Sequence, residues 1–114
     1  TYAGDIADAV MKIVVVNAES VKLNAQGSKL KAQSSNGIFH FSNDGIISWY
    51  DFAVAIRDIK QFNCKINPIP SSAYPTAAKR PAYSGLSKDK IVSAFHIQLK
   101  AWKESLQECL YKLG

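Results

Sequence analysis

The sequence predicts an α/β fold of about two strands and four helices, in a single domain that spans residues 1–114. Apolar residues recur at helical spacing near both ends and in the middle of the chain. Two short apolar segments bounded by turn residues are typical of strands. They flank a helix of about fifteen residues, and this strand–helix–strand order is typical of a βαβ unit. A length of 114 residues provides for one modest core.

The first helix is predicted over residues 3–16, where the apolar positions Ile6, Val10, Ile13 and Val14 follow helical spacing. Residues 17–36 are rich in Asn, Ser, Gln, Gly and Lys, which predicts a variable loop or insertion with a short strand around residues 21–23. The first main strand is predicted at residues 38–41, between Gly37 and the turn of residues 42–45. We expect His40 to be a hydrogen-bonded core residue of that strand.

A second helix should begin at Ser48, because Asp51 stands three residues later as in a capping box. It should end near residues 62–63. Its apolar stripe is Trp49, Phe52, Ala53, Ile56 and Ile59. Residues 64–70 predict a second strand, short or at a sheet edge because Pro68 and Pro70 have no amide hydrogen.

Two more helices are predicted after an irregular loop over residues 71–86. Ser87 can cap a short helix with Ile91 and Phe95 on one face. The last helix should run from about residue 99 to residue 113 and end at Gly114. Its predicted buried side consists of Trp102, Leu106, Cys109, Leu110 and Leu113.

Composition limits the function classes. The net charge of +5 is compatible with anionic partners, although the basic residues are scattered as on an ordinary solvated surface. No apolar run approaches the roughly 18 residues of a membrane span. Cys64 and Cys109 make no disulfide framework and have no metal-ligand spacing, so we expect reduced thiols in or near the core and a cytoplasmic protein.

The chain carries no motif for catalysis, cofactor binding or metal binding. It has no Gly-rich phosphate loop, no Tyr followed four residues later by Lys, and no Gly-x-Ser-x-Gly. We therefore predict that this segment supplies no catalytic, cofactor-binding or metal-binding residue and is inactive by itself.

The positive signal is the irregular loop, where basic and aromatic residues stand together between two stiffening prolines. Arg80 offers a planar fork of donors that matches a phosphate, and Lys79 adds a point charge. Tyr74 and Tyr83 offer stacking faces and hydroxyls, and Ser84 follows. This composition suits a nucleoside diphosphate. The alternative is a surface loop whose tyrosines cover a small core.

Several blocks of the sequence resemble the C-terminal part of the dTDP-4-dehydrorhamnose reductases, which belong to the extended short-chain dehydrogenase/reductase family. The blocks are TYAGDIADAV, GIFHFSNDGIISWYDFAVAI, NPIPSSAYPTAAKRPAYSGLSKDKI and AWKESLQECL. The resemblance implies the later part of a Rossmann-type reductase, without its N-terminal dinucleotide-binding half. That family passes a hydride from NADPH or NADH to the 4-keto carbon of dTDP-4-dehydro-L-rhamnose in dTDP-L-rhamnose synthesis. The cofactor is expected only in a full-length parent.

The resemblance also implies roles for individual residues. Arg80, in the Arg-Pro-x-x-Ser pattern, matches the position expected near the diphosphate, and the turn of residues 42–45 should face the site. Thr1 lies with Tyr2 in a stretch that matches the edge of the substrate pocket. The implied substrate-binding residues are Arg80, Lys79, Tyr83, Ser84, Tyr74 and Tyr2.

The implied partners are a dTDP-sugar and the N-terminal Rossmann half, with neither nucleic acid nor membrane. Because this segment by itself would expose an apolar face, we expect it to form a homodimer, to exchange elements between copies or to be marginally stable. Two other functions stay open: a non-catalytic regulatory or interaction module of the same family, and a small basic nucleic-acid binder. The latter would need base-stacking aromatics on a sheet.

Overall fold

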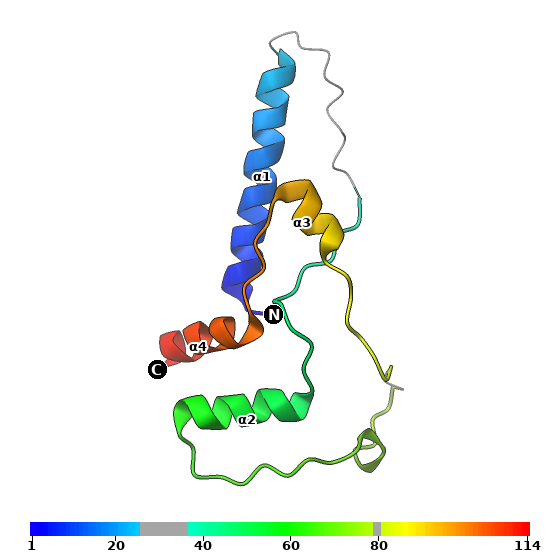
Figure 1. Ribbon diagram of the computed structural model, residues 1–114, viewed down its shortest axis with the longest axis vertical. Helices are drawn as coiled ribbons and strands as arrows, with labels where there is room; N and C mark the ends of the chain where they lie inside the picture. The colour runs from blue at the N-terminus through cyan, green and yellow to red at the C-terminus, as the bar shows by residue number, and fades with distance from the viewer. Residues whose placement is uncertain (26–36, 79–80) are drawn as a thin grey trace.

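The computed structural model describes residues 1–25, 37–78 and 81–114. The described residues form four α-helices and one short 3-10 helix (Figure 1). In chain order these are α1 (Ala3–Ala25), α2 (Trp49–Lys60), η1 (Ser71–Ala73), α3 (Asp89–Phe95) and α4 (Trp102–Leu113).

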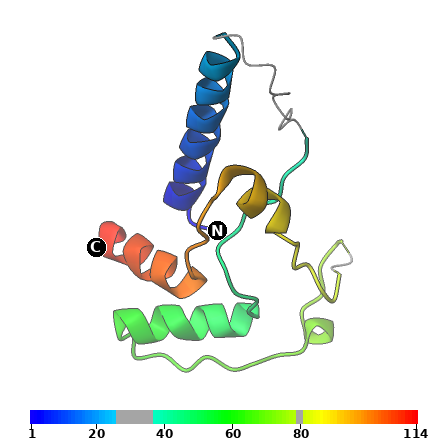
Figure 2. The same cartoon turned by 45° about the horizontal axis from the view of Figure 1, so that its top comes forward.

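The helices form two pairs. Helix α3 packs beside the middle of α1, and α2 packs along α4 below the N-terminal end of α1 (Figures 1 and 2). The described parts of the long connection between α2 and α3, residues 61–78 and 81–88, run along the outside of this arrangement (Figure 1). The two pairs meet near the start of α1, where the chain segment before α2 lies beside the segment that leads into α4.

The core lies between α1 and α3. Its buried residues are Ala9, Ile91, Phe95 and Ile97. Ala9 has the smallest possible apolar side chain at the contact, which lets the two helices approach closely. Phe39 packs edge-on against Phe95, with 5.1 Å between the ring centroids and 63° between the ring planes. Such aromatic pairs stabilise a core beyond their buried area.

The predicted sheet is not confirmed. No segment of the described residues is a strand, and both segments predicted as strands, 38–41 and 64–70, are irregular. An isolated parallel bridge joins Asp44 to Ala101. A β-strand forms only where its backbone hydrogen-bonds to that of an adjacent strand. In the described part of the chain neither segment has an adjacent strand. His40, expected in the core, is therefore exposed.

Helix α1 is nine residues longer than the sequence pattern predicted. Residues 17–25 belong to this helix and not to a variable loop, and no strand forms at residues 21–23. This segment contains neither Gly nor Pro and is rich in good helix formers, so the helix continues through it to Ala25. The remainder of the predicted loop, residues 26–36, lies outside the described residues.

The sequence predicted the ends of α2 and α4 well. Ser48 and Asp51 form the capping box, and Gln61 ends α2 in a left-handed conformation. Gly114, with a φ of 89°, follows the end of α4, which begins at Trp102 and not near residue 99. At the start of α3 the N-cap is Lys88, although the hydroxyl of Ser87 accepts a hydrogen bond of 3.2 Å from the Asp89 backbone.

The predicted helix faces are only partly correct. On α1, Ala9 is buried, while Ile6, Val10 and Val14 are 43%, 51% and 54% exposed. Trp49 and Leu113 were expected to be buried and are 79% and 75% exposed. The radius of gyration is 19.3 Å. A compact domain of this length has about 13 Å, so the two helix pairs form an open arrangement with much apolar surface uncovered.

Candidate functional site

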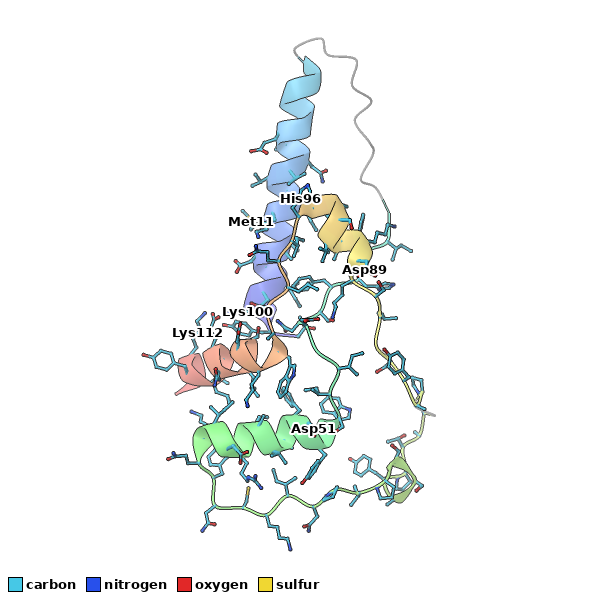
Figure 3. All side chains as sticks on the ribbon, viewed as in Figure 1. Met11, Asp51, Asp89, His96, Lys100 and Lys112 are labelled. Atoms are coloured by element: carbon cyan, nitrogen blue, oxygen red, sulfur yellow. The ribbon has the colours of Figure 1, made fainter. Side chains whose placement is uncertain are left out.

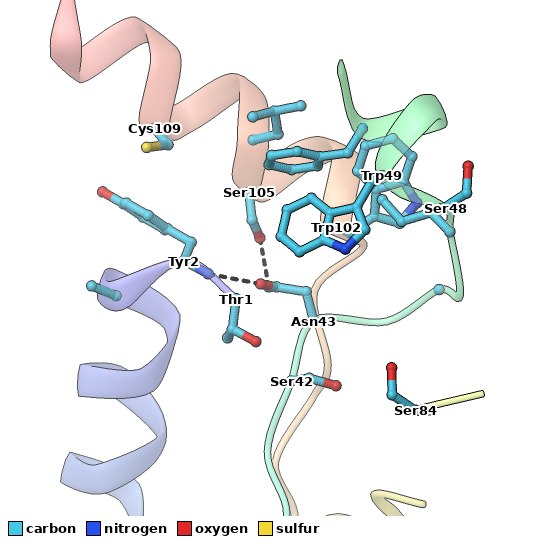
Figure 4. Close-up of a pocket in the computed structure, with 15 residues that line it drawn as sticks. Thr1, Tyr2, Ser42, Asn43, Ser48, Trp49, Ser84, Trp102, Ser105 and Cys109 are labelled. Atoms are coloured by element: carbon cyan, nitrogen blue, oxygen red, sulfur yellow. Dashed lines mark hydrogen bonds between the residues drawn. The ribbon is translucent and has the colours of Figure 1, made fainter. Parts of the chain in front are cut away.

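A cavity of about 610 Å³ lies where the two helix pairs meet, between the start of α1 and the facing sides of α2 and α4 (Figure 4). Its volume is in the range that binds small molecules and cofactors. The residues that line it are Thr1, Tyr2, Ala3, Ser42, Asn43, Gly45, Ile47, Ser48, Trp49, Phe52, Ser84, Trp102, Ser105, Leu106 and Cys109.

One side of the cavity is aromatic. The ring of Phe52 lies between the two tryptophans, with centroid distances of 6.3 Å to Trp49 and 6.3 Å to Trp102. These rings lie on the first turns of α2 and α4, the two paired helices. Aromatic faces of this kind bind planar rings and the apolar face of a sugar.

The polar part of the cavity lining is uncharged. Hydroxyl groups line it from the start of α1, the 42–48 turn, α4 and the long connection, and these come from Thr1, Ser42, Ser48, Ser84 and Ser105. No acidic or basic side chain lines the cavity within the described residues. The nearest described basic groups lie just outside the lining: Lys112 donates to the Tyr2 hydroxyl (3.1 Å) and Lys88 to the Asn43 carbonyl (3.4 Å).

The turn of residues 42–48, which lines the cavity, depends on Gly45, whose φ is 106°. Two backbone hydrogen bonds hold the turn to α4: the Asp44 amide donates to the Lys100 carbonyl (2.8 Å), and the Trp102 amide donates to the Asp44 carbonyl (2.9 Å). A Cβ atom on Gly45 would lie only 2.5 Å from Cδ1 of Trp102. The indole can lie in the cavity wall because position 45 has no side chain.

Helix α2 reaches the cavity through its capped N-terminus. The Asp51 amide donates to the Ser48 hydroxyl (3.1 Å), and the Ser48 amide donates to the Asp51 carboxylate (3.0 Å). Hydrogen bonds from the side chain and backbone of Ser48 lower the pKa of the Asp51 carboxyl. The carboxylate therefore stays ionised at the start of the helix, where the helix dipole favours a negative charge.

Lys112 on α4 contacts the phenol of Tyr2 and belongs to a charged group with Glu108 and Lys100. Lys112 donates to the Tyr2 hydroxyl (3.1 Å) and to the Glu108 carboxylate (2.8 Å), and Lys100 donates to the other oxygen of Glu108. Hydrogen bonds from these two lysines lower the pKa of Glu108 to about 2. Figure 3 shows Lys100 and Lys112 on this side of the molecule. The group fixes the phenol of Tyr2 at the cavity edge.

The structure separates the residues that the sequence predicted as a binding site. Tyr2 and Ser84, which are 82 positions apart in the sequence, both line the cavity. Tyr74 and Tyr83 lie outside it and are 63% and 66% exposed. Lys79 and Arg80 lie outside the described residues.

Sequence reasoning missed several residues of the cavity. Trp102 and Phe52 were expected only to fill the core, because an aromatic residue on a helical stripe looks the same whether it lines a core or a cavity. Ser105 had no signal of its own, because its hydrogen bond to Asn43 joins positions 62 residues apart, a distance that no local pattern reports. Asn43 belongs to the turn of residues 42–45, which the family resemblance implied should face the site, and Ser42, Asn43 and Gly45 of this turn line the cavity.

The described residues do not suit a nicotinamide cofactor or a metal ion. They contain no strand followed by a Gly-rich turn and a helix, which is the arrangement that binds a dinucleotide. They also contain no group of three or more His, Cys, Asp or Glu side chains placed to hold a metal.

Both cysteines are free thiols, Cys64 on the surface and Cys109 at the cavity. None of the helices in the described part of the chain is long and apolar enough to cross a membrane.

Comparison with known proteins relates the chain to one family. The model of the RmlD substrate binding domain family matches residues 1–114. A dTDP-4-dehydrorhamnose reductase from Aggregatibacter actinomycetemcomitans is 37% identical over 115 residues, which cover 94% of this chain and 35% of that protein. One from Sinorhizobium fredii is 35% identical over 119 residues, covering 99% of this chain and 36% of that protein.

The spore coat polysaccharide biosynthesis protein SpsK of Bacillus subtilis is 34% identical over 110 residues, covering 96% of this chain and 32% of that protein. The chain thus spans about a third of the length of these relatives. No solved structure matches it.

Proposed function

The chain belongs to the RmlD substrate binding domain family, and from this we propose that it is the sugar-nucleotide-binding part of a dTDP-4-dehydrorhamnose reductase. The longer protein reduces the 4-keto group of dTDP-4-dehydro-L-rhamnose with NADPH or NADH. The dinucleotide and the proton-transferring Tyr-x-x-x-Lys pair belong to its N-terminal Rossmann half, because this segment contains neither of the motifs. The segment alone is inactive as a reductase.

The observation that carries the proposal is the cavity of about 610 Å³ whose lining combines aromatic rings with hydroxyl groups. A dTDP-sugar consists of a planar base, two charged phosphates and a hydroxyl-bearing ring. The aromatic side suits the flat and apolar parts of such a ligand, and the hydroxyls suit its oxygens. Tyr2 and Ser84, two of the residues that the family resemblance implies, line this cavity.

The charge for the diphosphate comes from the loop that precedes Ser84. Arg80 stands four residues before Ser84, a separation that an extended chain spans in at most about 14 Å. Its guanidinium can form two parallel hydrogen bonds to phosphate oxygens. We assign Arg80 and Lys79 to the diphosphate and Tyr74 and Tyr83 to the outer edge of the same site.

Calorimetric titration of the chain with dTDP tests this function. We expect binding, and we expect Arg80→Ala to weaken it by about 1.5–3 kcal/mol, or roughly 10-fold to 150-fold, because a charged hydrogen bond to phosphate is lost. Arg57→Ala is the matched control: Arg57 is on α2, is bonded to Asp58 at 2.7 Å and does not line the cavity. Its affinity should stay within about twofold.

Two results would contradict the proposal. If the chain gives no heat with dTDP while circular dichroism reports its helices, this segment has no nucleotide site. If Arg80→Ala and Arg57→Ala bind dTDP equally well, the diphosphate is not held by the loop.

The proposal includes a partner surface on α1. Val10, Met11, Val14 and Val15 form an exposed apolar stripe on this helix, on the side away from the core residue Ala9. A stripe of this kind suits packing against the N-terminal half of the longer reductase, or against a second copy when that half is absent.

Sedimentation velocity checks this surface. We expect the chain to sediment as a dimer or larger species, and the double substitution Val10→Ser/Val14→Ser to shift it to monomer, because it removes apolar area from the stripe. Ile69→Ser, at a position that is 62% exposed on the long connection, is the control and should leave the species unchanged. A monomeric unsubstituted chain at the concentrations of the titration would be evidence against this surface.

A further inference from the structure

The two helix pairs meet at one buried side chain, Asn43, which is 7% exposed. Its Oδ1 accepts a hydrogen bond from the Tyr2 backbone amide at the start of α1 (3.0 Å). Its Nδ2 donates to Oδ2 of Asp5 on α1 (2.6 Å) and to Oγ of Ser105 on α4 (2.8 Å). Figure 4 shows the bonds to Tyr2 and Ser105. One amide is therefore bonded to a helix of each pair.

The hydrogen bonds of this junction form a closed set. Ser105 is 1% exposed, and its hydroxyl accepts from Asn43 and donates to Oδ2 of Asp5 at 2.5 Å. In the part of the chain that the structure describes, no buried side-chain nitrogen or oxygen lacks a partner. The amide has one suitable orientation, because the reverse one would place its oxygen against the Asp5 carboxylate. Such a fully satisfied network is rigid and specifies one arrangement.

The two walls of the cavity depend on this junction for their separation. Tyr2 lines the cavity from the α1 side, and Trp102 lines it from α4. The backbone bonds of Asp44 hold the turn to α4 and do not reach α1. The bond between Lys112 and the Tyr2 hydroxyl does reach across, but it is exposed to water. The buried connections between the walls run through the junction of Asn43, Asp5 and Ser105: Asn43 bonds to both helices, and Ser105 of α4 also donates directly to Asp5 of α1.

We propose that Asn43 is a positioning residue: its pairing with Asp5 fixes Tyr2 relative to Trp102 and thereby sets the affinity of the cavity for a nucleoside diphosphate. The ligand rests on the proposed function above. The positioning role rests on the hydrogen bonds alone and has its own readout.

The test exchanges the two side chains. Asn43→Asp places a carboxylate against Asp5 and should weaken dTDP binding at least tenfold, because like charges at this distance repel. Asp5→Asn removes the acceptor and should also weaken binding. In the double variant Asp5→Asn/Asn43→Asp, the amide introduced at position 5 can donate to the carboxylate introduced at position 43. We expect affinity to return to within about threefold of the unchanged chain.

Urea unfolding of the same four proteins gives the second readout. The coupling between the two substitutions should be about tenfold in the unfolding equilibrium constant. The matched control is Asp8→Asn/Asn67→Asp, which makes the same exchange at two exposed positions and should show no coupling. Ile91→Val, in the core between α1 and α3, should lower stability without changing dTDP affinity when measured where the protein is folded.

The outcomes separate the two proposals. Rescue by the double variant in both readouts supports the positioning role. Failure of the double variant to recover either quantity, or unchanged dTDP affinity in Asn43→Asp, overturns it. If the unchanged chain binds no dTDP, the proposed function and the affinity claim both fail. The coupling measured by unfolding then still decides whether the pair holds the two walls together.

Discussion

Replacing Gly45 with alanine is expected to lower the free energy of unfolding by about 2–4 kcal/mol and to deform the aromatic side of the cavity. The φ of 106° at this position is a conformation that residues with a side chain rarely adopt. The new Cβ would also lie 2.5 Å from Cδ1 and 3.1 Å from Nε1 of Trp102. Because these atoms belong to the indole ring, the whole side chain must move, and with it the contact to Phe52.

Urea unfolding followed by circular dichroism measures this loss, and tryptophan fluorescence reports the movement of Trp102. Gly85→Ala is the matched control. Its φ is not in the positive range, and the atom nearest to the new Cβ would be the hydroxyl of Tyr83, the far end of a movable side chain, at 2.8 Å. We expect a loss below about 1 kcal/mol there. Equal stability of Gly45→Ala and the unchanged chain would show that the turn does not depend on glycine.

Replacing Phe95 with alanine is expected to cost about 3–5 kcal/mol, which is the typical range for a buried aromatic side chain. Phe95 is 3% exposed, and its ring packs edge-on against Phe39 between α1 and α3. Native domains of this size are stable by only about 5–15 kcal/mol. The variant should therefore retain little of its folded population in mild urea.

Phe62→Ala is the control for the loss of stability in Phe95→Ala, because Phe62 lies just after α2 and is 56% exposed. It removes the same ring at the surface and should change the stability by less than about 0.5 kcal/mol. Thermal unfolding followed at the helical circular dichroism band distinguishes the two variants. Similar losses in both would contradict the assignment of the core to the α1–α3 pair.

Local chemistry made the helices predictable. The ends of α2 follow from Ser48, Asp51 and the residues around Gln61, since capping bonds form within a few residues of each other. The end of α4 at Gly114 follows from the freedom of glycine in the left-handed region. Ile91 and Phe95 were correctly expected on the inner face of α3, where both are 3% exposed.

Local patterns could not predict whether the strands form or which helix residues are exposed. The segment 38–41 has a strand-like composition, but a strand also needs a neighbouring chain, and no local pattern says whether one is present. Trp49 belongs to the apolar stripe of α2 but is 79% exposed. Whether another element covers a given residue of such a stripe depends on the rest of the fold.

The sequence by itself determined the family, the four helices and the chemical character of the loop around Arg80, because these depend on residue types and short spacings. The tertiary structure alone decided that Tyr2 and Ser84 line one cavity while Tyr74 and Tyr83 lie outside it. It also alone brought Asp5, Asn43 and Ser105 into one junction. The hydrogen bond between Ser105 and Asp5 joins residues that are 100 positions apart. Such a contact depends on how the helix pairs pack in space, and packing is not contained in any short stretch of the chain.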